Sequence, residues 1–506
     1  MSRREKILIA VGVVLGAVIL IPVIRHYQLR FAVANYVAEL KAKGEPMDLA
    51  QVIPPPATPE QNGSPFITNA LANLKFESVA VSNPPPAMRA ILPGKAMIGW
   101  QQSDIRSSDG TNRWEDLGRE LAAAKSELDS FQNLTNYPIL DFNLDYQKGY
   151  DLPIPHLGSL KRSAQWLSAS AIYSLHQGNT ANACADVRVM LAIAKGETDE
   201  RLIISQLVRI AIAAIGVSAT WEVLQDPNVS EDDLAQLQQD WQSLEFTSPL
   251  EQAMVFEQVE QIQELEQIRK SSKRFNEIWG YYYTSDTTSA NRGGDMMPLK
   301  TRSLFLRKWD ELRWRWFWSY QDELSGLQSF QVVLAATHMA ETNQSFQSVQ
   351  SFALARLKLD QNASYDLRNF SAQNANVLYS ALRKAIRIET ARNVVVTAIA
   401  LKRYELRHHQ LPATLDNLTP DLLQTVPIDC MDGEPLNYRP NVDGTFLLYS
   451  VGANGKDDDG NPSLEKGVIG SNSYWQNDHA LDWVWPQPAT GEEIQAYYKK
   501  LSSKSN

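Results

Sequence analysis

The sequence is poor in the residues that most often build covalent links and catalytic sites. Only two cysteines, Cys184 and Cys430, occur in 506 residues, which excludes a disulfide framework and a four-thiolate zinc site and leaves two unpaired thiols as the simplest expectation. Seven histidines limit histidine-based chemistry. The sequence has no His-Glu-x-x-His, no Gly-x-Ser-x-Gly and no Walker loop. These absences favour a structural or interaction protein over the common enzyme classes, although a carboxylate pair for glycoside hydrolysis stays open.

The sequence also lacks a basic run. Asp and Glu number 58 against 48 Lys and Arg, so the net charge is −10 and the pI is near 5.4. Because an acidic chain repels phosphate backbones, we expect no nucleic-acid partner. Hydrophobic residues make up 44 % of the chain, which is enough to build a sizeable core.

A long uncharged stretch, Ile7–Ile24, follows the basic N-terminal segment MSRREK. Its 18 residues extend ~27 Å as a helix, close to the ~30 Å hydrocarbon core of a bilayer. Large residues stand where a signal peptidase needs small ones, so the pattern predicts an uncleaved membrane anchor. The basic segment favours a cytoplasmic N-terminus, whereas Arg25 and Arg30 on the other side argue against it. We expect the chain after about residue 28 to lie outside the cytoplasm.

The distribution of proline, glycine and hydrophobic periodicity predicts a mainly α fold in five segments. They are a cytoplasmic tip and transmembrane anchor (1–28), a helix with a Pro-rich spacer (29–111), a helical body (112–377), a long helix with a small antiparallel sheet and an acidic loop (378–490), and a tail (491–506). Helices are expected over 114–134, 157–177, 180–194 and 199–224, and a strand near 78–81. Short turns between the helices are typical of antiparallel pairs, and a helical-repeat arrangement is an alternative.

Two segments of the body carry candidate binding features. Glu257, Glu260 and Glu264 share one helix face, which we interpret as solvated and not as a metal-binding face. The segment WDELRWRWFWSY, residues 309–320, holds four of the thirteen tryptophans, and WGYYY, residues 279–283, lies before a polar loop at 284–294. Trp309, Trp314 and Trp316 are the candidate ligand-binding residues, because such rings stack on sugars or lie at a membrane interface. Packing in the core or between domains is the interpretation that we favour for these aromatic residues.

The C-terminal region predicts a small α+β unit. A long helix is expected over 374–408, followed by strands at 436–439 and 445–451 joined through the turn signal Asp443-Gly444. The second strand leads into VGANGKDDDG, which contains three consecutive aspartates, Asp457, Asp458 and Asp459. Adjacent ionised carboxylates repel one another, so the loop is either a solvated turn or a site for a cation.

Several short motifs in this region resemble the C-terminal domain of type II secretion major pseudopilins, over roughly 385–486. They are Leu411-Pro412, Val426-Pro427-x-Asp429, Gly433-x-Pro435-Leu436-x-Tyr438, Ser450-Val451-Gly452-Ala453-Asn454-Gly455 and Asp482-Trp483-Val484-Trp485-Pro486. In that family the loop binds one calcium ion. The resemblance implies a calcium site formed by the Val451 carbonyl, Asn454 and Asp482, with Asp457, Asp458 and Asp459 as further candidates. Such clustered oxygens suit the six to eight hard ligands that calcium prefers.

The chain departs from pseudopilins in two ways. It lacks a prepilin-peptidase site, and over 300 residues separate the anchor from the C-terminal module, so we expect no assembly into a pseudopilus. The whole chain resembles large membrane-anchored proteins of bacteria such as planctomycetes, which implies an architecture and no activity. We therefore expect a single-pass bacterial inner-membrane protein with its bulk in the periplasm, protein partners in the cell envelope and a role in secretion or envelope assembly. The alternative is an envelope enzyme or glycan-binding protein that uses segment 279–320.

Overall fold

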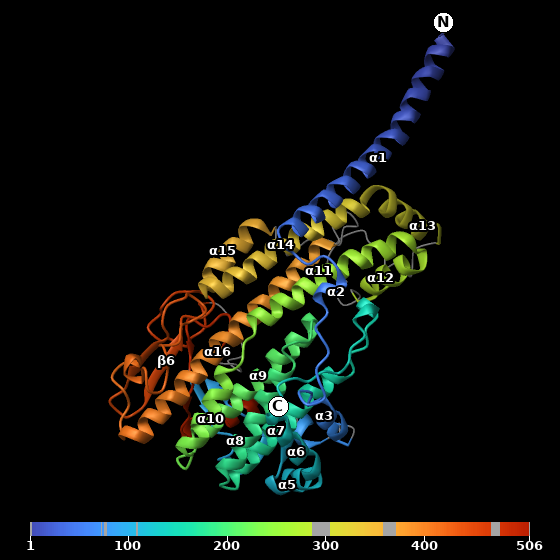
Figure 1. Cartoon of the computed structure of the whole chain (residues 1–506). Helices are drawn as coiled ribbons and strands as arrows, with labels where there is room; N and C mark the ends of the chain where they lie inside the picture. Colours follow the sequence, from blue (N-terminus) through green and yellow to red (C-terminus); the bar gives the residue numbers. More distant parts are fainter. Residues whose placement is uncertain are drawn as a thin grey trace.

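The computed structural model describes residues 3–71, 73–74, 78–107, 110–285, 304–357, 371–466 and 476–504, and it describes side chains within these ranges except for 3–19, 279–285, 304–307, 373 and 502–504. The fold is mainly helical, with 64 % helix against 7 % strand, which confirms the predicted class. Figure 1 shows one long helix that leaves a body of packed helices, with a small sheet at the far end.

The projecting element is α1 (Arg3–Ala42), a single helix of 40 residues. It joins the predicted anchor and the helix expected after it without a break, and it ends before Gly44, whose φ of +90° suits a helix stop. Its N-terminal part extends away from the body, and its C-terminal part lies along α14 (Figure 1).

Three short helices follow, α2 (Leu49–Val52), α3 (Ser64–Leu71) and α4 (Val79–Ser82). The strand expected at 78–81 is therefore wrong.

The lower part of the body in Figure 1 is a group of antiparallel helices. It contains α5 (Trp114–Ala123), α6 (Lys125–Gln132), the 3-10 helices η1 (Asn133–Asn136) and η2 (Tyr146–Asp151), α7 (His156–His176), α8 (Thr180–Gly196), α9 (Ile203–Leu224) and α10 (Glu231–Gln242). Helices α7, α8 and α9 pack on one another, as their short connections predict. The helix expected from 199 begins only at Ile203, which leaves 197–202 as a turn.

Helix α9 is the one helix among the described residues that is long and apolar enough to cross a membrane by length and composition. About 56 % of its apolar window is buried inside the protein. It packs against α7, α8, α11 and α16 and buries two charged side chains, Arg209 and Glu222. Its apolar character is therefore explained by its place in the core.

The rest of the body consists mainly of long helices, with short helical turns between some of them. They are α11 (Thr247–Lys270), α12 (Ser272–Ser285), α13 (Leu304–Arg313), the π-helical turn η5 (Trp314–Trp318), α14 (Ser319–Asn343), α15 (Phe346–Arg356), the 3-10 turn η6 (Ser371–Gln373) and α16 (Asn374–His408). Helices α11, α14 and α16 contact one another and run side by side in Figure 1. The bounds of α16 confirm the helix predicted over 374–408. The expected loop at 284–294 lies outside the described residues from 286 onward.

The predicted C-terminal hairpin is confirmed. Strands β5 (Asn437–Pro440) and β6 (Phe446–Ser450) pair antiparallel, and β7 (Trp483–Val484) adds to β6. The 3-10 turn η7 (Leu415–Leu418) begins after its N-cap Thr414, and α16 packs on β6. Helix α17 (Gly491–Lys504) forms the tail.

A second sheet joins the segment before α5 to the segment before α17. Strands β1 (Arg89–Leu92) and β2 (Lys95–Met97) form a hairpin, and β2 pairs in parallel with β8 (Gln487–Pro488). Lys95 Nζ also forms an ion pair with Glu493 Oε1 at 2.5 Å. A two-stranded ribbon, β3 (Ile105–Ser107) with β4 (Gly110–Asn112), lies nearby in the sequence. The segment before α5, expected to be a spacer, is thus part of the folded body.

One buried apolar cluster extends from Ile67 to Trp485 and includes residues of α7–α10, α14, α16 and β6. The helical body and the C-terminal module therefore share a core through α16. Cys184 and Cys430 are both buried and free, which confirms the expectation of unpaired thiols.

The predicted solvated face of α11 is wrong. Glu260 and Glu264 are buried, and Glu257 is half-buried. Glu264 forms a bidentate ion pair with Arg274 of α12, with N–O distances of 2.6 and 2.7 Å. The tight turn at Gly149, with φ of +54°, brings η2 against the Glu260 carboxylate. Neighbouring elements therefore cover a face that is polar in sequence.

Candidate functional site

The predicted calcium loop is organised around Asp482, a fully buried residue just before β7. Its Oδ1 accepts the backbone N–H of Asp458 at 3.3 Å, and its Oδ2 accepts that of Asn461 at 2.9 Å. Burial raises the pKa of Asp482, while these two N–H groups act in the opposite direction. The Asp482 carboxylate therefore closes the loop onto the sheet.

Three of the six predicted calcium ligands lie together in this loop. The side-chain amide of Asn454 donates to Asp458 Oδ2 at 3.0 Å, and Asp458 in turn lies against Asp482. Asn454 Oδ1 accepts the N–H of Lys456 at 2.9 Å. Val451 is buried at the start of the loop, and its N–H donates to Asp429 Oδ2 at 2.8 Å. The loop thus gathers an amide and two carboxylates.

The other two aspartates of the run have separate partners. The Tyr449 hydroxyl donates to Asp457 Oδ1 at 2.9 Å, and the Arg439 guanidinium pairs with Asp459 Oδ1 at 2.7 Å. Asp459 also has a positive φ of 61°, which turns the chain between its neighbours. The structure therefore brings Asn454, Asp458 and Asp482 together and engages Asp457 and Asp459 elsewhere.

The three candidate tryptophans do not form one ligand site. Trp314 is fully buried, with its Nε1–H donating to Asp322 Oδ2 at 3.2 Å, so its proposed role in ligand binding is wrong. Trp309 and Trp316 are about half exposed. The ring of Trp316 lies 5.5 Å from that of His26 on α1. The side chains of 279–283 lie outside those that the structure describes.

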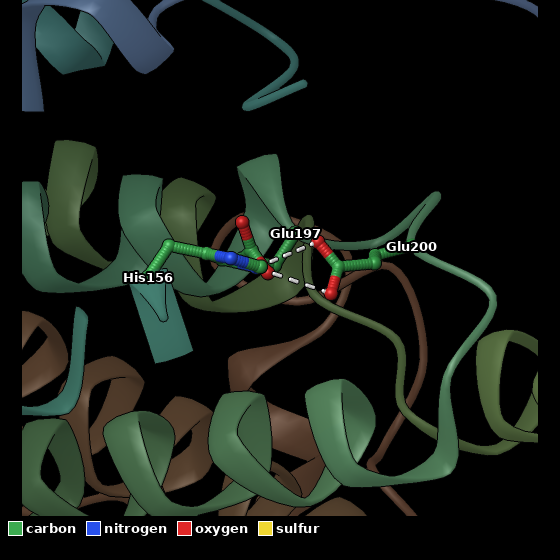
Figure 2. Close-up of side chains that lie close together, drawn as sticks. All are labelled: His156, Glu197 and Glu200. Carbon is green, nitrogen blue, oxygen red and sulfur yellow. Dashed lines mark hydrogen bonds and ion pairs between the residues drawn. The ribbon is translucent and has the colours of Figure 1, made fainter. Parts of the chain in front are cut away.

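A second group of residues, unexpected from the sequence, lies inside the helical body. Figure 2 shows His156, Glu197 and Glu200 with their polar ends directed toward one another. His156 is the first residue of α7, Glu197 caps the C-terminus of α8, and Glu200 lies in the turn before α9. All three side chains are buried, and one ligand atom from each lies within 4.8 Å of the others.

Two of these residues already contact each other. His156 Nε2 lies 3.0 and 3.2 Å from the two oxygens of Glu200 (Figure 2). The Ser205 hydroxyl donates to Glu200 Oε1, and the ring of Phe142 stacks on the His156 ring at 4.2 Å. These contacts fix the orientation of the imidazole and of one carboxylate.

Glu197 has no such partner. It is 1 % exposed, and within the described part of the chain no N–H or O–H group donates to either carboxylate oxygen; the group beside it is the Glu200 carboxylate, which can share a hydrogen bond with it only if one of the two is protonated. It also caps the C-terminus of α8, where the helix dipole disfavours a negative charge. Burial, and next the Glu200 carboxylate, raise the pKa of Glu197 well above its ordinary value. A bare Glu197 carboxylate is therefore costly here, and a proton or a cation has to compensate it.

The turn at 197–202 is held by α9. The Gln206 side-chain amide donates to the Glu200 carbonyl at 2.7 Å. The buried Arg209 guanidinium donates to the Ala194 carbonyl at 2.6 Å and to Thr198 Oγ1 at 2.9 Å. These bonds explain why the helix begins at Ile203 and why Glu200 faces His156.

Two cavities flank this buried group. His156 lines a cavity of about 610 Å³, together with Phe142, Lys148 and Arg162. Glu200 lines another of about 290 Å³ beside the prolines at 54–56. Phe142, Asn143 and Leu144 line both, so the two cavities adjoin at this segment. The group thus lies at the border of solvent-reachable space.

A further acidic group, Glu251, His338 and Glu341, lies near the surface between α11 and α14. His338 is exposed, and the two glutamates are half-buried. Burial, and next the Glu251 carboxylate, raise the pKa of Glu341 to about 7. A proton on this pair suffices to explain its proximity, so we assign it no further role.

No family model matches this chain, and no curated protein or solved structure matches it. The pseudopilin resemblance and the calcium site that it implies therefore stay predictions.

Sequence reasoning missed the group of His156, Glu197 and Glu200 because its signals are weak. The two glutamates form a Glu-x-x-Glu pair, but the expected helix from 199 runs through the turn that places Glu200. His156 stands 41 positions before Glu197 (197 − 156), so no local spacing links them. The one available signal was two acidic residues at a helix end, where basic residues are favoured.

Proposed function

We propose that this chain is a single-pass membrane protein that holds a helical body and a calcium-binding C-terminal module outside the cytoplasm. Its role is structural or interaction-based, in a bacterial secretion or envelope assembly. The observation that carries the proposal is the helix α1, which projects from the body (Figure 1). Several of its apolar side chains are exposed. Leu20, Ile21 and Ile24 are each about half to two-thirds exposed, an arrangement that water disfavours.

A group of exposed aromatic and apolar side chains beside α1 supports the same proposal. Trp309, Leu312, Trp316 and Phe317 are exposed on α13 and η5, and η5 contacts α1. Arg25 donates to Gln321 Oε1 at 2.8 Å, so α1 is fixed to the body at the end of the apolar run. Tryptophan is enriched at membrane–water interfaces, so this surface suits the level of the lipid headgroups.

The calcium part of the proposal rests on Asn454, Asp458 and Asp482. Two carboxylates and the Asn454 side-chain amide lie within one loop, and the Val451 carbonyl is at its start; calcium binding requires the amide to turn its oxygen, which accepts the Lys456 N–H, toward the carboxylates. A calcium ion binds oxygens of these types and relieves the repulsion between the Asp458 and Asp482 carboxylates. Asp457 and Asp459 have other partners, and the calcium site that we propose does not include them. The glycan-binding alternative loses support because Trp314 is buried.

Membrane insertion is tested with two arginines in the apolar run. In the variant Leu15→Arg/Val18→Arg each charge costs about 2.5–3.5 kcal/mol at the centre of a membrane helix. We expect the wild type to resist alkaline carbonate extraction and to float with vesicles, and the variant to be released. The control Ala122→Arg/Ala123→Arg puts the same charges on an exposed part of α5. Release of the wild type, or equal retention of both variants, contradicts the anchor.

Calcium binding is tested on the full chain in detergent, because α16 shares its core with the body. We expect calcium to raise the Tm relative to the same protein with a calcium-selective chelator, and magnesium to have little effect, since it demands tighter octahedral geometry. An unchanged Tm at millimolar calcium argues against the calcium site and leaves the anchor unaffected.

A further inference from the structure

We propose that His156, Glu197 and Glu200 bind one divalent transition-metal ion, with zinc as the best fit. The ligands are the Nε2 atom of His156 and an oxygen from each glutamate. One imidazole and two carboxylates are ligands that zinc accepts in sites with an open fourth position. The inference goes beyond membrane anchoring and the calcium loop, and it stands whichever way those tests turn out.

The unpartnered Glu197 carboxylate carries the proposal. Buried polar groups in folded proteins nearly always have a partner, and a buried carboxylate without one is rare. Among the described residues no donor group reaches either oxygen of Glu197, and the side chain is directed at His156 and at the Glu200 carboxylate (Figure 2). A bound dication gives it a partner and offsets the unfavourable helix C-terminus at the same time.

In the part of the chain that the structure describes, no neighbouring cation pairs with Glu197. Arg209 is the buried guanidinium on the adjacent helix, and its hydrogen bonds go to other groups. They are the Ala194 and Glu245 carbonyls, Gln206 Oε1 and Thr198 Oγ1. Its charge lowers the free-energy cost of burying the two carboxylates, but it forms no hydrogen bond with either of them.

The distances suit a small ion. With zinc–ligand bonds of ~2.0–2.2 Å, tetrahedral ligand atoms stand roughly 3.3 Å apart. His156 Nε2 and the Glu200 oxygens are already 3.0–3.2 Å apart. All three ligand atoms lie within 4.8 Å of one another, so Glu197 has to move inward by at most about 1.5 Å.

The cavities give the ion an entry path and an open side. His156 lines the larger cavity and Glu200 the smaller one, whereas Glu197 lines neither and lies behind them. A fourth ligand, water or a small anion, enters from the larger cavity, whose lining includes Lys148 and Arg162. The Phe142 ring on His156 limits how many further ligands fit.

The rival explanation is a proton on Glu197, shared with Glu200. It predicts no metal in the purified protein. The experiment dialyses the full chain against zinc in excess calcium, so that the C-terminal loop is saturated, and measures bound metal by mass spectrometry. We expect about one zinc per chain, removed by 1,10-phenanthroline, which leaves calcium in place.

The variant Glu197→Gln keeps the side-chain size and removes the ligand charge. We expect its zinc affinity to fall at least ~10-fold, by analogy with the cost of weakening a metal's ligand shell. Asp199→Asn is the matched control, because Asp199 is exposed two residues away and loses the same charge. Equal zinc retention in Glu197→Gln and wild type, or equal loss in Asp199→Asn, overturns the site.

A second measurement needs no variant. Cobalt added to the metal-free wild type reports a four- or five-coordinate nitrogen–oxygen site through intense visible absorption, and zinc displaces it. We expect this absorption to saturate at one equivalent. Absence of any saturable band, with the protein folded by circular dichroism, contradicts the proposal and supports the shared proton.

Discussion

At the scale of single residues, Glu222 links two distant parts of the chain. It is fully buried on α9, and its Oε1 accepts the N–H of Met88 at 2.8 Å and that of Gly99 at 3.0 Å. Burial raises the pKa of Glu222 to about 8, even though three backbone contacts lower it. The side chain therefore acts as a buried acceptor that fixes the segment containing β1 and β2.

Replacing Glu222 by alanine removes that acceptor and leaves two buried N–H groups without a partner. We expect Glu222→Ala to lower the free energy of unfolding by roughly 3 kcal/mol, since each orphaned donor costs ~1–3 kcal/mol. Glu222→Gln retains an acceptor oxygen and is expected to cost clearly less. Denaturant melts of both variants check this, and equal losses in the two contradict the acceptor role.

Neighbouring aspartates in the C-terminal loop are expected to behave differently. Asp458 lies between Asn454 and Asp482, whereas Asp459 pairs with Arg439. We expect Asp458→Asn to abolish the rise in Tm that calcium produces, and Asp459→Asn to retain it. The pair is a matched test, because each variant removes one carboxylate charge from adjacent positions. If only Asp459→Asn loses the rise in Tm that calcium produces, the calcium site is formed by other oxygens and our assignment of Asp458 is wrong.

Local chemistry was predictable from sequence where the partner is close in the chain. Ser230 caps α10 by accepting the N–H of Asp233 at 3.0 Å, and a serine directly before a helix, with an acidic residue three positions later, is a local sequence signal for such a cap. The partner of Glu200 lies 44 positions away, at His156. A single sequence contains no periodicity for such a contact, which depends on how α7 and α8 pack.

At the scale of elements, α16 and α11 show where prediction succeeds and fails. The bounds of α16 and the hairpin after it follow from hydrophobic periodicity and turn residues, and the structure confirms them. The α11 face with Glu260 looks solvated in sequence, but η2 and α12 cover it. Burial of a polar face depends on tertiary neighbours that pair its charges, such as Arg274.

The π-helical turn η5 presents one tryptophan to the core and one to the surface. Trp314 is buried, and Trp316 is 56 % exposed beside α1. If this surface lies at the membrane interface, lipids brominated near the headgroup quench Trp316. We expect Trp316→Phe to reduce the quenched fraction of fluorescence and Trp314→Phe to leave it unchanged. Equal quenching in wild type and Trp316→Phe contradicts contact of η5 with lipid.

At the scale of the whole molecule, the N- and C-terminal parts of the body meet. Strand β2 pairs with β8 almost 400 positions later, and the Trp221 Nε1–H donates to the Pro486 carbonyl at 2.9 Å. These strands are two or three residues long, too short for a sequence pattern to reveal. The sequence therefore predicted the helices and the C-terminal hairpin, but not the way in which the spacer and the tail close the body.

Several buried acids give the molecule an expected pH dependence. Burial raises the pKa of Asp186, Asp322 and Glu257 to about 7, and that of Asp429 to about 6. The folded protein holds these protons more tightly than the unfolded chain, in which the carboxyl pKa is near 4. The protonated acids therefore contribute stability that is fully present below pH 4 and is lost as the pH rises through the pKa of the folded protein. We expect Tm to fall between pH 5.5 and pH 8 at constant calcium and zinc. A Tm that rises over this interval contradicts the burial of these acids.

The orientation of the body across the membrane is the central claim, and cysteine labelling tests it most directly. Both native cysteines are buried, so introduced ones report with little background. Ala122→Cys lies at an exposed position of the body, and Ser2→Cys lies at the N-terminus. With a membrane-impermeant maleimide on intact spheroplasts, the account predicts labelling of Ala122→Cys at once and of Ser2→Cys only after permeabilisation. Labelling of Ala122→Cys only after permeabilisation contradicts it.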